Sequence, residues 1–502
     1  MMQEDTKGRA LGVLYYIGCV LVVLAGTEVI ALGTSLIYQE WKFVFIFIIS
    51  ICIMLGVGLG FIYLGAKHRH ARLSLGEGMA VAAGAWLVGM LLCALPYYFS
   101  GNYLSYLDSC FDVMSGLTTT GLTLIQDMDH LANGLNMWRF ILTYIGGQGM
   151  VVLALVFLTN DTASTYKIYV GEAKDEKLMP SAVHTSRAIW KISLIYLGVG
   201  WIVMSIAGLV AGMPLSSAIL HGLWIFVSGW STGGFAPMSQ NILYYHSFFY
   251  EIATVIFFVI GSFNFALHYA VLTGKRKEIK HNIEIISFTV TVTILTLVVC
   301  FGLMRNNVYP DFIAMFRKGF YQLISGHTTT GFMSLYARQL YHEWGDMALF
   351  GMTVAMLLGG SACSTAGGFK GLRIGILFKA IKEDINKYTM PESRVYTTRI
   401  HHIKDIILTD SLVRSTAVIV LLYIVTFAIS ILTGMSAGYS LVESAFEGAS
   451  ATGNVGLSIG ITSVSSPAYY KISYIVIMWL ARLEFLSVLT LIGQIRKRVL
   501  KR

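Results

Sequence analysis

Four stretches recur along this chain as near copies of one another: S-G-L-T-T-T-G-L at 115–122, S-G-W-S-T-G-G-F at 228–235, S-G-H-T-T-T-G-F at 325–332 and E-G-A-S-A-T-G-N at 447–454. In each stretch a glycine precedes a second glycine by five positions, and the residues between them are mostly Thr, Ser or Gly. Long apolar segments flank every copy, and about 95 to 125 residues separate successive copies. The pattern indicates a fourfold internal repeat.

The composition indicates a membrane protein. Of the 502 residues, 56% are hydrophobic and only 13% are charged, and the mean hydropathy is +0.68. Soluble domains carry about 25% charged residues, and runs of about 20 apolar residues are long enough to cross a bilayer as helices. We therefore expect an all-α polytopic membrane protein that forms a single transmembrane unit. The first apolar run, at about 11–37, exceeds the core of a signal peptide and is expected to be a retained helix.

The net charge of +9 follows the expected membrane topology and gives no reason to infer a nucleic-acid partner. Alternate connections, at 99–136, 212–247 and 434–468, contain almost no Lys or Arg. This asymmetry is the positive-inside pattern, and it predicts that both termini are cytoplasmic. The basic residues gather instead at 7–9, 67–72, 275–280, 370–404 and 496–502.

Acidic residues lie in the segments expected on the opposite side of the membrane, among them Asp108, Asp112 and Glu447. A negative vestibule there would concentrate cations before they enter. Solvated loop charge without a function is the alternative for any single one of them.

The sequence offers no sign of an enzyme. Six cysteines are scattered, mostly within apolar runs, without C-x-x-C spacing, so we expect small core residues. There is no H-E-x-x-H motif, no Walker A loop and no convincing nucleophile elbow. The absence of these motifs argues against an ATPase, a protease or a redox enzyme.

Helix, half-helix, loop and helix follow one another four times after an opening pair of helices. Each half-helix is too short to span a bilayer and leads into one of the repeated stretches, as a re-entrant pore helix does. We expect ten spanning helices, with four pseudo-symmetric repeats around one pore. The predicted boundaries are 1–70 for the two N-terminal transmembrane helices, and 71–160, 161–280, 281–400 and 401–502 for pore repeats 1 to 4.

The four loops suggest a ring of backbone carbonyls around one axis. A cation that enters must exchange its water shell for such oxygens, and glycine permits the crowded backbone that presents them. Small-residue seams between packed helices are the alternative, which a single copy would favour. The predicted ion-selectivity filter consists of Thr118, Thr119, Thr120, Gly121, Ser231, Thr232, Gly233, Gly234, Thr328, Thr329, Thr330, Gly331, Ser450, Ala451, Thr452, Gly453 and Asn454.

Two further features carry a mechanistic prediction. The third return helix is interrupted by G-G-S-A-C-S-T-A-G-G at 359–368. Each glycine costs a helix roughly 1 kcal/mol, so we expect a break that lines a wet cavity; a packing seam is the alternative. Arg482 lies deep in the last apolar run, where an arginine usually marks function or a paired network.

These features resemble the TrkH-type membrane subunits of bacterial potassium uptake systems, in the Trk/Ktr/HKT superfamily. The resemblance covers nearly the whole chain. It rests on the four loops, on G-G-S-A-C-S-T-A-G-G-F-K at 359–370, on W-L-A-R-L-E-F at 479–485 and on N-F-A-L-H-Y at 264–269. It implies K+ uptake across the inner membrane, a homodimer with one pore in each protomer, and no organic cofactor in this chain. It also implies a separate TrkA-like cytosolic subunit with nucleotide-binding RCK domains, for which 370–404 is a plausible docking face.

The resemblance also implies roles for single residues. The loop 359–368 would obstruct the pore below the filter as a gate, and Arg482 would face the pore, where its charge limits ion occupancy. The alternative for Arg482 is a structural tie to a loop carbonyl or carboxylate. The predicted gate consists of Gly359, Gly360, Ser361, Ser364, Thr365, Gly367, Gly368 and Arg482. The expected K+ ligands are at Thr119, Thr120, Thr232, Gly233, Thr329, Thr330, Ala451 and Thr452.

Ion preference is the open question at this stage. All four filter glycines are present, which the resemblance implies favours K+, because a Ser in place of the first-loop glycine accompanies sodium preference in plant HKT relatives. The fourth stretch departs most, with Glu447 at the leading Ser position and Asn454 after its second glycine. The rivals are a sodium-permeable or sodium-coupled member of the same superfamily and an organic-solute secondary transporter. The second typically has inverted repeats, whereas these four repeats all have the same sense.

Overall fold

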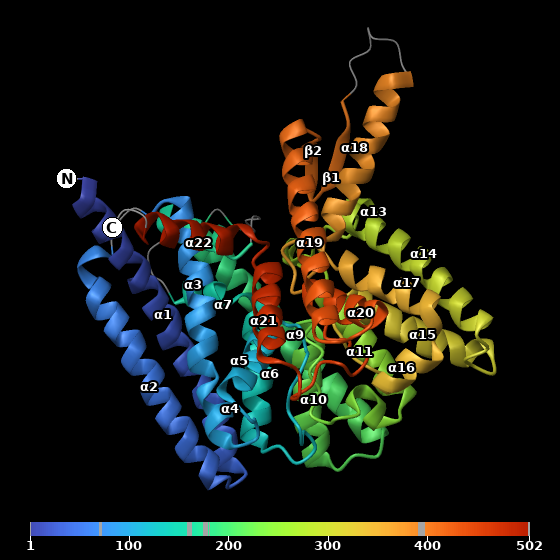
Figure 1. Cartoon of the computed structure of the whole chain (residues 1–502), viewed down its shortest axis with the longest axis horizontal. Helices are drawn as coiled ribbons and strands as arrows, with labels where there is room; N and C mark the ends of the chain where they lie inside the picture. Colours follow the sequence, from blue (N-terminus) through green and yellow to red (C-terminus); the bar gives the residue numbers. More distant parts are fainter. Residues whose placement is uncertain are drawn as a thin grey trace.

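The computed structural model describes residues 2–69, 73–157, 163–173, 179, 181–389 and 397–499. Within these ranges the chain is all-helical apart from its loops and one two-stranded antiparallel hairpin. Most of the long helices run side by side between two ends of the molecule (Figure 1). The start of helix α1 and the whole of α22 lie at the same end of the molecule, which we call the terminal end. We call the opposite end the distal end.

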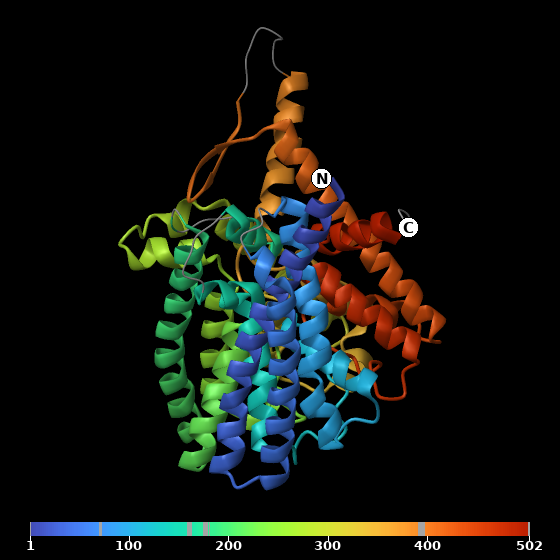
Figure 2. The same ribbon diagram turned by 90° about the vertical axis from the view of Figure 1, so that its left-hand side faces the viewer.

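The N-terminal helices form a pair at one edge of the bundle. These are α1 (Met2–Ile37) and α2 (Trp41–Gly65), which lie side by side in both views (Figure 2). Many of the large side chains on α2 face outward, including Phe45, Ile49 and Tyr63. Such an apolar outer surface suits a lipid environment, because lipid chains need no polar partner.

Four units of one kind follow this pair. In each unit a long helix runs towards the distal end, a half-helix turns back into the bundle, and a broken helix returns (Figure 1). Unit 1 comprises α3 (Leu75–Cys93), α4 (Leu95–Ser100), α5 (Tyr106–Leu117), α6 (Asn133–Gln148) and α7 (Met150–Val156). Unit 2 comprises α9 (Ala182–Val210), α10 (Leu215–Trp230), α11 (Phe248–Gly261) and α12 (Phe265–Leu272). Unit 3 comprises α14 (Ile283–Arg305), α15 (Phe312–His327), α17 (Gly345–Leu358) and α18 (Gly371–Thr389). Unit 4 comprises α19 (Asp410–Ser436), α20 (Leu441–Gly453), α21 (Ala468–Arg482) and α22 (Leu486–Val499).

Short elements connect these helices. They are η1 (Ala66–His68), α8 (Ala163–Gly171), η2 (Asn241–Tyr245), α13 (Glu278–His281), α16 (Ala337–Glu343), β1 (Arg399–His402) and β2 (Lys404–Ile407).

The half-helices α5, α10, α15 and α20 are re-entrant because of their length and their starting signals. They have 12, 16, 16 and 13 residues, and at about 1.5 Å per residue they are shorter than a hydrocarbon core of about 30 Å. The side chain of Ser105 caps α5, Asp311 caps α15, and Ser440 forms a capping box with Glu443 at α20. These caps satisfy the first free amides of each helix at the distal end. α10 follows Pro214 instead.

All four return helices break inside the bundle. The bends are 82° between α6 and α7, 100° between α11 and α12, and 114° between α21 and α22. In unit 3 the irregular segment 359–370 separates α17 from α18. The first break is at Gly149, whose φ of +106° is open to glycine but strained for other residues. Broken backbone at this depth is tolerated where protein surrounds it or water reaches it.

The number of spans that length and composition identify is lower than the ten we predicted. In the described ranges six helices are long and apolar enough to cross a membrane, or up to nine when each bent pair counts as one span. The difference lies in the return helix of unit 3. There α17 has only 14 residues, and α18 (GLRIGILFKAIKEDINKYT) carries many charged residues.

The hairpin of β1 and β2 lies at the terminal end beside α18 (Figure 1). His401 joins the hairpin to α13, because its Nε2 lies 2.9 Å from Glu278 Oε2. Its Nδ1 lies 2.8 Å from Oδ1 of Asp405, in the other strand of the hairpin. The hydrogen bonds to Asp405 and then to Glu278 raise the pKa of His401 above its ordinary value.

We predict that attachment of this hairpin to α13 weakens as the pH rises. A raised native pKa means that the stabilisation is fully present below about pH 6.5, the ordinary histidine value, and is lost as the pH rises through the native pKa. The test compares hydrogen exchange of amides 399–407 in the wild type and in a His401→Gln variant at the same pH. The wild type should exchange more slowly than the variant at pH 5.5, and this difference should shrink at pH 9. An equal difference at both pH values would contradict the prediction.

Candidate ion pathway

The loops that follow the four half-helices share one backbone pattern. The first loop residue with a positive φ is Thr119 (56°), Thr232 (51°), Thr329 (56°) or Asn454 (54°). Two positions later comes a glycine with a positive φ, which is Gly121 (90°), Gly234 (68°), Gly331 (82°) or Gly456 (92°). In every unit the amide of the first of these residues donates to the carbonyl three residues back, and the next amide donates to the carbonyl five residues back. The four loops are therefore built alike.

In unit 4 this pattern lies three residues further along the chain than we predicted. Helix α20 continues to Gly453, so Ser450, Ala451, Thr452 and Gly453 belong to its last turn, and of the predicted residues only Asn454 lies in the loop. The carbonyls of Ser450 and Ala451 already accept the amides of Val455 and Asn454. The residues equivalent to Thr120 and Gly121 are Val455 and Gly456. The prediction for 450–453, including ion ligands at Ala451 and Thr452, is corrected accordingly.

The four loop glycines meet in a closed cycle. A Cβ atom at Gly121 would come within 2.6 Å of the Gly233 carbonyl oxygen. A Cβ atom would likewise overlap with the carbonyl oxygen of Thr330 if placed at Gly234, of Val455 if placed at Gly331, and of Thr120 if placed at Gly456. Each loop thus touches the next, and the fourth returns to the first. The four segments therefore surround one axis, and the approach is close enough that only glycine fits.

In loops 1 and 3, pairs of threonine hydroxyls lie close together within the same segment. Thr118 Oγ1 donates to the Met114 carbonyl at 2.7 Å and lies 2.8 Å from Thr120 Oγ1. Unit 3 repeats the arrangement, with 2.9 Å between the hydroxyls of Thr328 and Thr330. All four of these side chains are buried. These four hydroxyls therefore stabilise the loops in which they lie.

The segment 359–370 packs directly against these loops. Thr365 Oγ1 lies 3.2 Å from Thr232 Oγ1 and donates to the Gly261 carbonyl at 2.8 Å. The amide of Gly367 donates to Thr329 Oγ1 at 2.8 Å. The predicted gate residues of this segment, which are Gly359, Gly360, Ser361, Ser364, Thr365, Gly367 and Gly368, are all buried. The segment therefore contacts Thr232 of loop 2 and Thr329 of loop 3, through Thr365 and Gly367.

Arg482 ties three units together at this level. It is the last residue of α21, and its Nη1 donates to the Thr365 carbonyl at 2.5 Å. Its Nη2 donates to the carbonyls of Gly146 at 2.5 Å and Gly147 at 3.0 Å, just before the break in unit 1. Of the two interpretations of Arg482, the structural tie is present, to one carbonyl of segment 359–370 and two carbonyls of α6.

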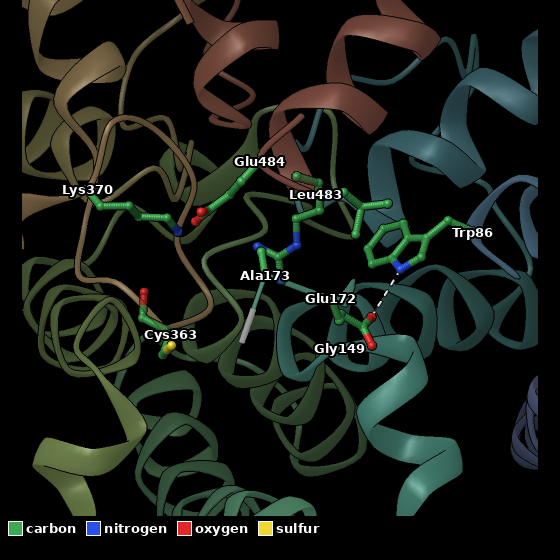
Figure 3. A pocket seen from close by; sticks show the side chains of 10 residues that line it. Trp86, Gly149, Glu172, Ala173, Cys363, Lys370, Leu483 and Glu484 are labelled. Atoms are coloured by element: carbon green, nitrogen blue, oxygen red, sulfur yellow. Dashed lines mark hydrogen bonds between the residues drawn. The ribbon is translucent and has the colours of Figure 1, made fainter. Parts of the chain in front are cut away.

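A small cavity lies beside segment 359–370, which lines it with Cys363, Ser364 and Lys370 (Figure 3). Its volume of about 20 Å³ is enough for a single water. Glu172 lines it and accepts hydrogen bonds from Trp86 Nε1 and from the Val152 amide, both at 3.0 Å. The side chains of Lys370 and Glu484 point towards each other across it (Figure 3). Charged groups of both signs therefore surround the segment on this side.

Three acidic residues that we considered for a negative vestibule are buried. Asp108 and Asp112 are each 1% exposed and Glu447 is 0% exposed. Asp108 forms an ion pair of 2.6 Å with Lys471 of α21. Asp112 and Glu447 accept hydrogen bonds from the loops behind which they lie. These three carboxylates therefore act within the protein, and the vestibule prediction fails for them.

A helical membrane bundle in which four re-entrant half-helices close their loops around one axis defines a pore-loop transport protein. The family model described as "TrkH: Cation transport protein" matches residues 42–496. The chain belongs to this TrkH family of cation transport proteins.

Individual relatives agree with the family. The chain is 32% identical over 426 residues to the Trk system potassium uptake protein TrkG of Escherichia coli, covering 83% of this chain and 84% of the relative. It is 30% identical over 424 residues to an uncharacterised cation transporter of Methanocaldococcus jannaschii, covering 84% and 83%. The crystal structure of the potassium transporter TrkH from Vibrio parahaemolyticus superposes with a TM-score of 0.81 at 24% identity, covering 96% of this chain and 98% of that one. The fold is thus shared over nearly the full length.

Proposed function

We propose that this chain takes up K+ through the axis that its four loops surround. The observation that carries the proposal is the closed cycle of Gly121, Gly234, Gly331 and Gly456 against neighbouring carbonyls. Such a ring offers a dehydrated cation the oxygens that replace its water shell. The names of the relatives, which are potassium uptake proteins, support K+ as the ion.

The proposed ion ligands are two successive main-chain carbonyls from each loop. They are those of Thr119 and Thr120, Thr232 and Gly233, Thr329 and Thr330, and Asn454 and Val455. The half-helices point their C-terminal ends, which carry partial negative charge, towards these carbonyls. Inward movement would be driven chiefly by the membrane potential, which supplies about 2.3 kcal/mol per charge per 100 mV.

In this proposal the segment 359–368 and Arg482 form the gate. The contacts of Thr365 and Gly367 with the loop hydroxyls support a position across the ion path. The glycines support a segment able to rearrange, because a backbone without Cβ atoms has more accessible conformations. Opening would require Arg482 to release one or more of its three carbonyl partners.

Flux into proteoliposomes tests the function directly. Purified protein should carry K+ down an imposed potential, and excess Na+ should compete weakly. Equal competition by Na+ would instead favour the sodium-permeable rival within the superfamily. Growth of a potassium-uptake-deficient cell at low external K+ tests the same function in vivo. A flux of organic solute with no cation flux would overturn the proposal in favour of a secondary transporter.

We further propose that the terminal end is cytoplasmic in the inner membrane and docks a TrkA-like nucleotide-binding subunit, and that the chain forms a homodimer. Helix α18 and the hairpin project beyond the bundle at this end (Figure 1) and carry much of the basic segment 370–404. A route from this surface to the gate is available through Glu284. Its Oε1 accepts the Ala362 amide of the gate segment at 2.6 Å, and its Oε2 lies 3.8 Å from Nδ1 of His402 in β1.

Replacing Glu284 should loosen the gate even without a partner. The Glu284 side chain is 2% exposed, so Glu284→Ala leaves the half-buried Ala362 amide without this acceptor, at a cost of about 1–3 kcal/mol to the closed form. We expect basal K+ flux to rise several-fold, and Glu284→Gln to give a smaller rise. Glu278→Ala is the matched control, because Glu278 also contacts the hairpin, through His401, at 2.9 Å. An equal rise in both alanine variants would assign the effect to the hairpin alone.

A further inference from the structure

One position of the half-helix bonds the loop segment that follows the loop glycine, which we call the outward limb, in units 1, 3 and 4. The position is eight residues before the loop residue whose carbonyl meets the loop glycine of the preceding unit in the cycle. The four residues there are Asp112, Ile225, Gln322 and Glu447. Four residues after that carbonyl residue, the outward limb has Leu124, Pro237, Ser334 or Ile459.

In units 1 and 4 the half-helix residue is a buried carboxylate that holds this limb. Asp112 Oδ1 accepts the Leu124 amide at 2.7 Å, and its Oδ2 accepts the Thr123 hydroxyl at 2.7 Å. Glu447 Oε1 accepts the Ile459 amide at 3.2 Å and the Ser458 hydroxyl at 2.5 Å. The same two donor positions of the loop are therefore bound in both units, by side chains of different length.

Units 2 and 3 show that the half-helix carries a hydrogen-bond acceptor only where the limb has a backbone amide to donate. In unit 3 the neutral Gln322 takes the position, and its Oε1 accepts the Ser334 amide at 3.3 Å. In unit 2 the limb has Pro237, which has no amide hydrogen, and the half-helix residue is the apolar Ile225. A polar side chain is present in units 1, 3 and 4, where a backbone amide needs an acceptor, and absent from this position in unit 2.

From this correspondence we infer that Asp112 and Glu447 are positioning residues that set the ion selectivity of the pathway. The inference rests on the proposed function. Units 1 and 4 are neighbours in the cycle, since Gly456 meets the Thr120 carbonyl. Both carboxyl groups thus hold limbs of the two loops that meet at this junction.

The consequence concerns the spacing of carbonyls around the ion. Discrimination between K+ and Na+ depends on the size of the ring of oxygens or on the field they exert. Either depends on how firmly each limb is held, because the limb continues directly from the carbonyl residue. A loosened limb lets the ring shrink around the smaller ion, and selectivity falls while conduction persists.

The experiment measures the K+-to-Na+ permeability ratio of full-length protein in proteoliposomes for three variants. Asp112→Ala removes both acceptors and should lower the ratio at least tenfold. Asp112→Asn keeps an acceptor for the Leu124 amide and should lower it much less. Asp127→Ala removes an equal charge from the same connection, but from a side chain that is 65% exposed and contacts only His130 among the described residues, and should leave the ratio unchanged.

The ratio is independent of the amount of folded protein, so a purely structural role for Asp112 would lower the yield and leave the ratio intact, which would overturn the inference. Equal loss in Asp112→Ala and Asp127→Ala would overturn it as well, in favour of a surface-charge effect. Glu447→Ala and Glu447→Gln give a second, independent pair if Asp112→Ala fails to fold. Wild-type protein that carries no K+ would instead refute the proposed function itself.

Discussion

Gly456→Ala is expected to abolish K+ selectivity and most K+ flux. Its Cβ would overlap with the Thr120 carbonyl oxygen, and its φ of +92° is unfavourable for any residue with a Cβ. The Thr120 carbonyl has little room to retreat, because the next residue, Gly121, packs against the Gly233 carbonyl so closely that a Cβ would not fit there. The displaced carbonyl is one of the proposed ligands. We expect a drop of at least a hundredfold in K+ flux, measured in proteoliposomes per reconstituted protein.

Gly460→Ala is the matched control for this prediction. Gly460 has the same φ of +92° and lies four residues further along the same loop, so both variants carry a similar backbone strain of about 1–2 kcal/mol. A Cβ at Gly460 meets only the Ala337 side chain, at 3.9 Å. Its thermal stability should fall by no more than that of Gly456→Ala, because it carries the strain without the overlap, and its flux should be retained. Equal loss of flux in both variants would mean that strain, and not the contact with Thr120, is responsible.

The architecture was predictable because its signals are local. A half-helix too short to span, followed by a Gly-terminated loop, is readable within about twenty residues, and three of the four loops have the register that we predicted. The break at 359–370 was equally readable, since several glycines in ten residues disfavour any helix. What these signals could not give was the contact between units, such as the hydrogen bond from Gly367 to Thr329.

The register of the fourth loop was mispredicted because two kinds of glycine look alike in a sequence. Gly448 and Gly453 match the spacing of the other copies, but both lie in α20. A Cβ at either would overlap, at Gly448 with the Ser430 side chain and at Gly453 with the Met356 carbonyl, so helix packing requires them. The correct signal was also present. Ser450 precedes Gly456 by six residues, as Ser115 precedes Gly121, and Leu follows the glycine in both.

The roles of the acidic residues depended on contacts that no local pattern encodes. Asp112 and Glu447 were read as outward-facing because they lie in connections poor in basic residues. Their partners are amides 12 residues further along the chain, Leu124 and Ile459, and these contacts form only when the loop folds back over its half-helix. Because the sequence does not reveal these donors, Asp112 and Glu447 were interpreted as solvent-facing charges.

Arg482→Ala is expected to open the pathway, raising K+ flux at least tenfold while leaving the K+-to-Na+ ratio unchanged. The substitution removes hydrogen bonds to the carbonyls of Thr365, Gly146 and Gly147. Bonds from a charged donor contribute about 1.5–3 kcal/mol each, and about 1.4 kcal/mol is a tenfold change in an equilibrium. If the open form lacks even one of them, its population rises by that factor. The measurement is ion flux in proteoliposomes, with thermal stability followed in parallel.

Arg482→Lys separates the two mechanisms that the arginine could use. If its positive charge limits ion occupancy, lysine keeps that charge and flux should stay low. If the guanidinium holds the gate closed by bridging units 1 and 3, lysine should behave like alanine, because a single ammonium cannot reach the carbonyls of Thr365 and Gly146 together as the planar fork does. The observed bridge favours the second outcome, so we expect raised flux in both variants. Low flux in Arg482→Lys alone would show that the charge itself is the barrier.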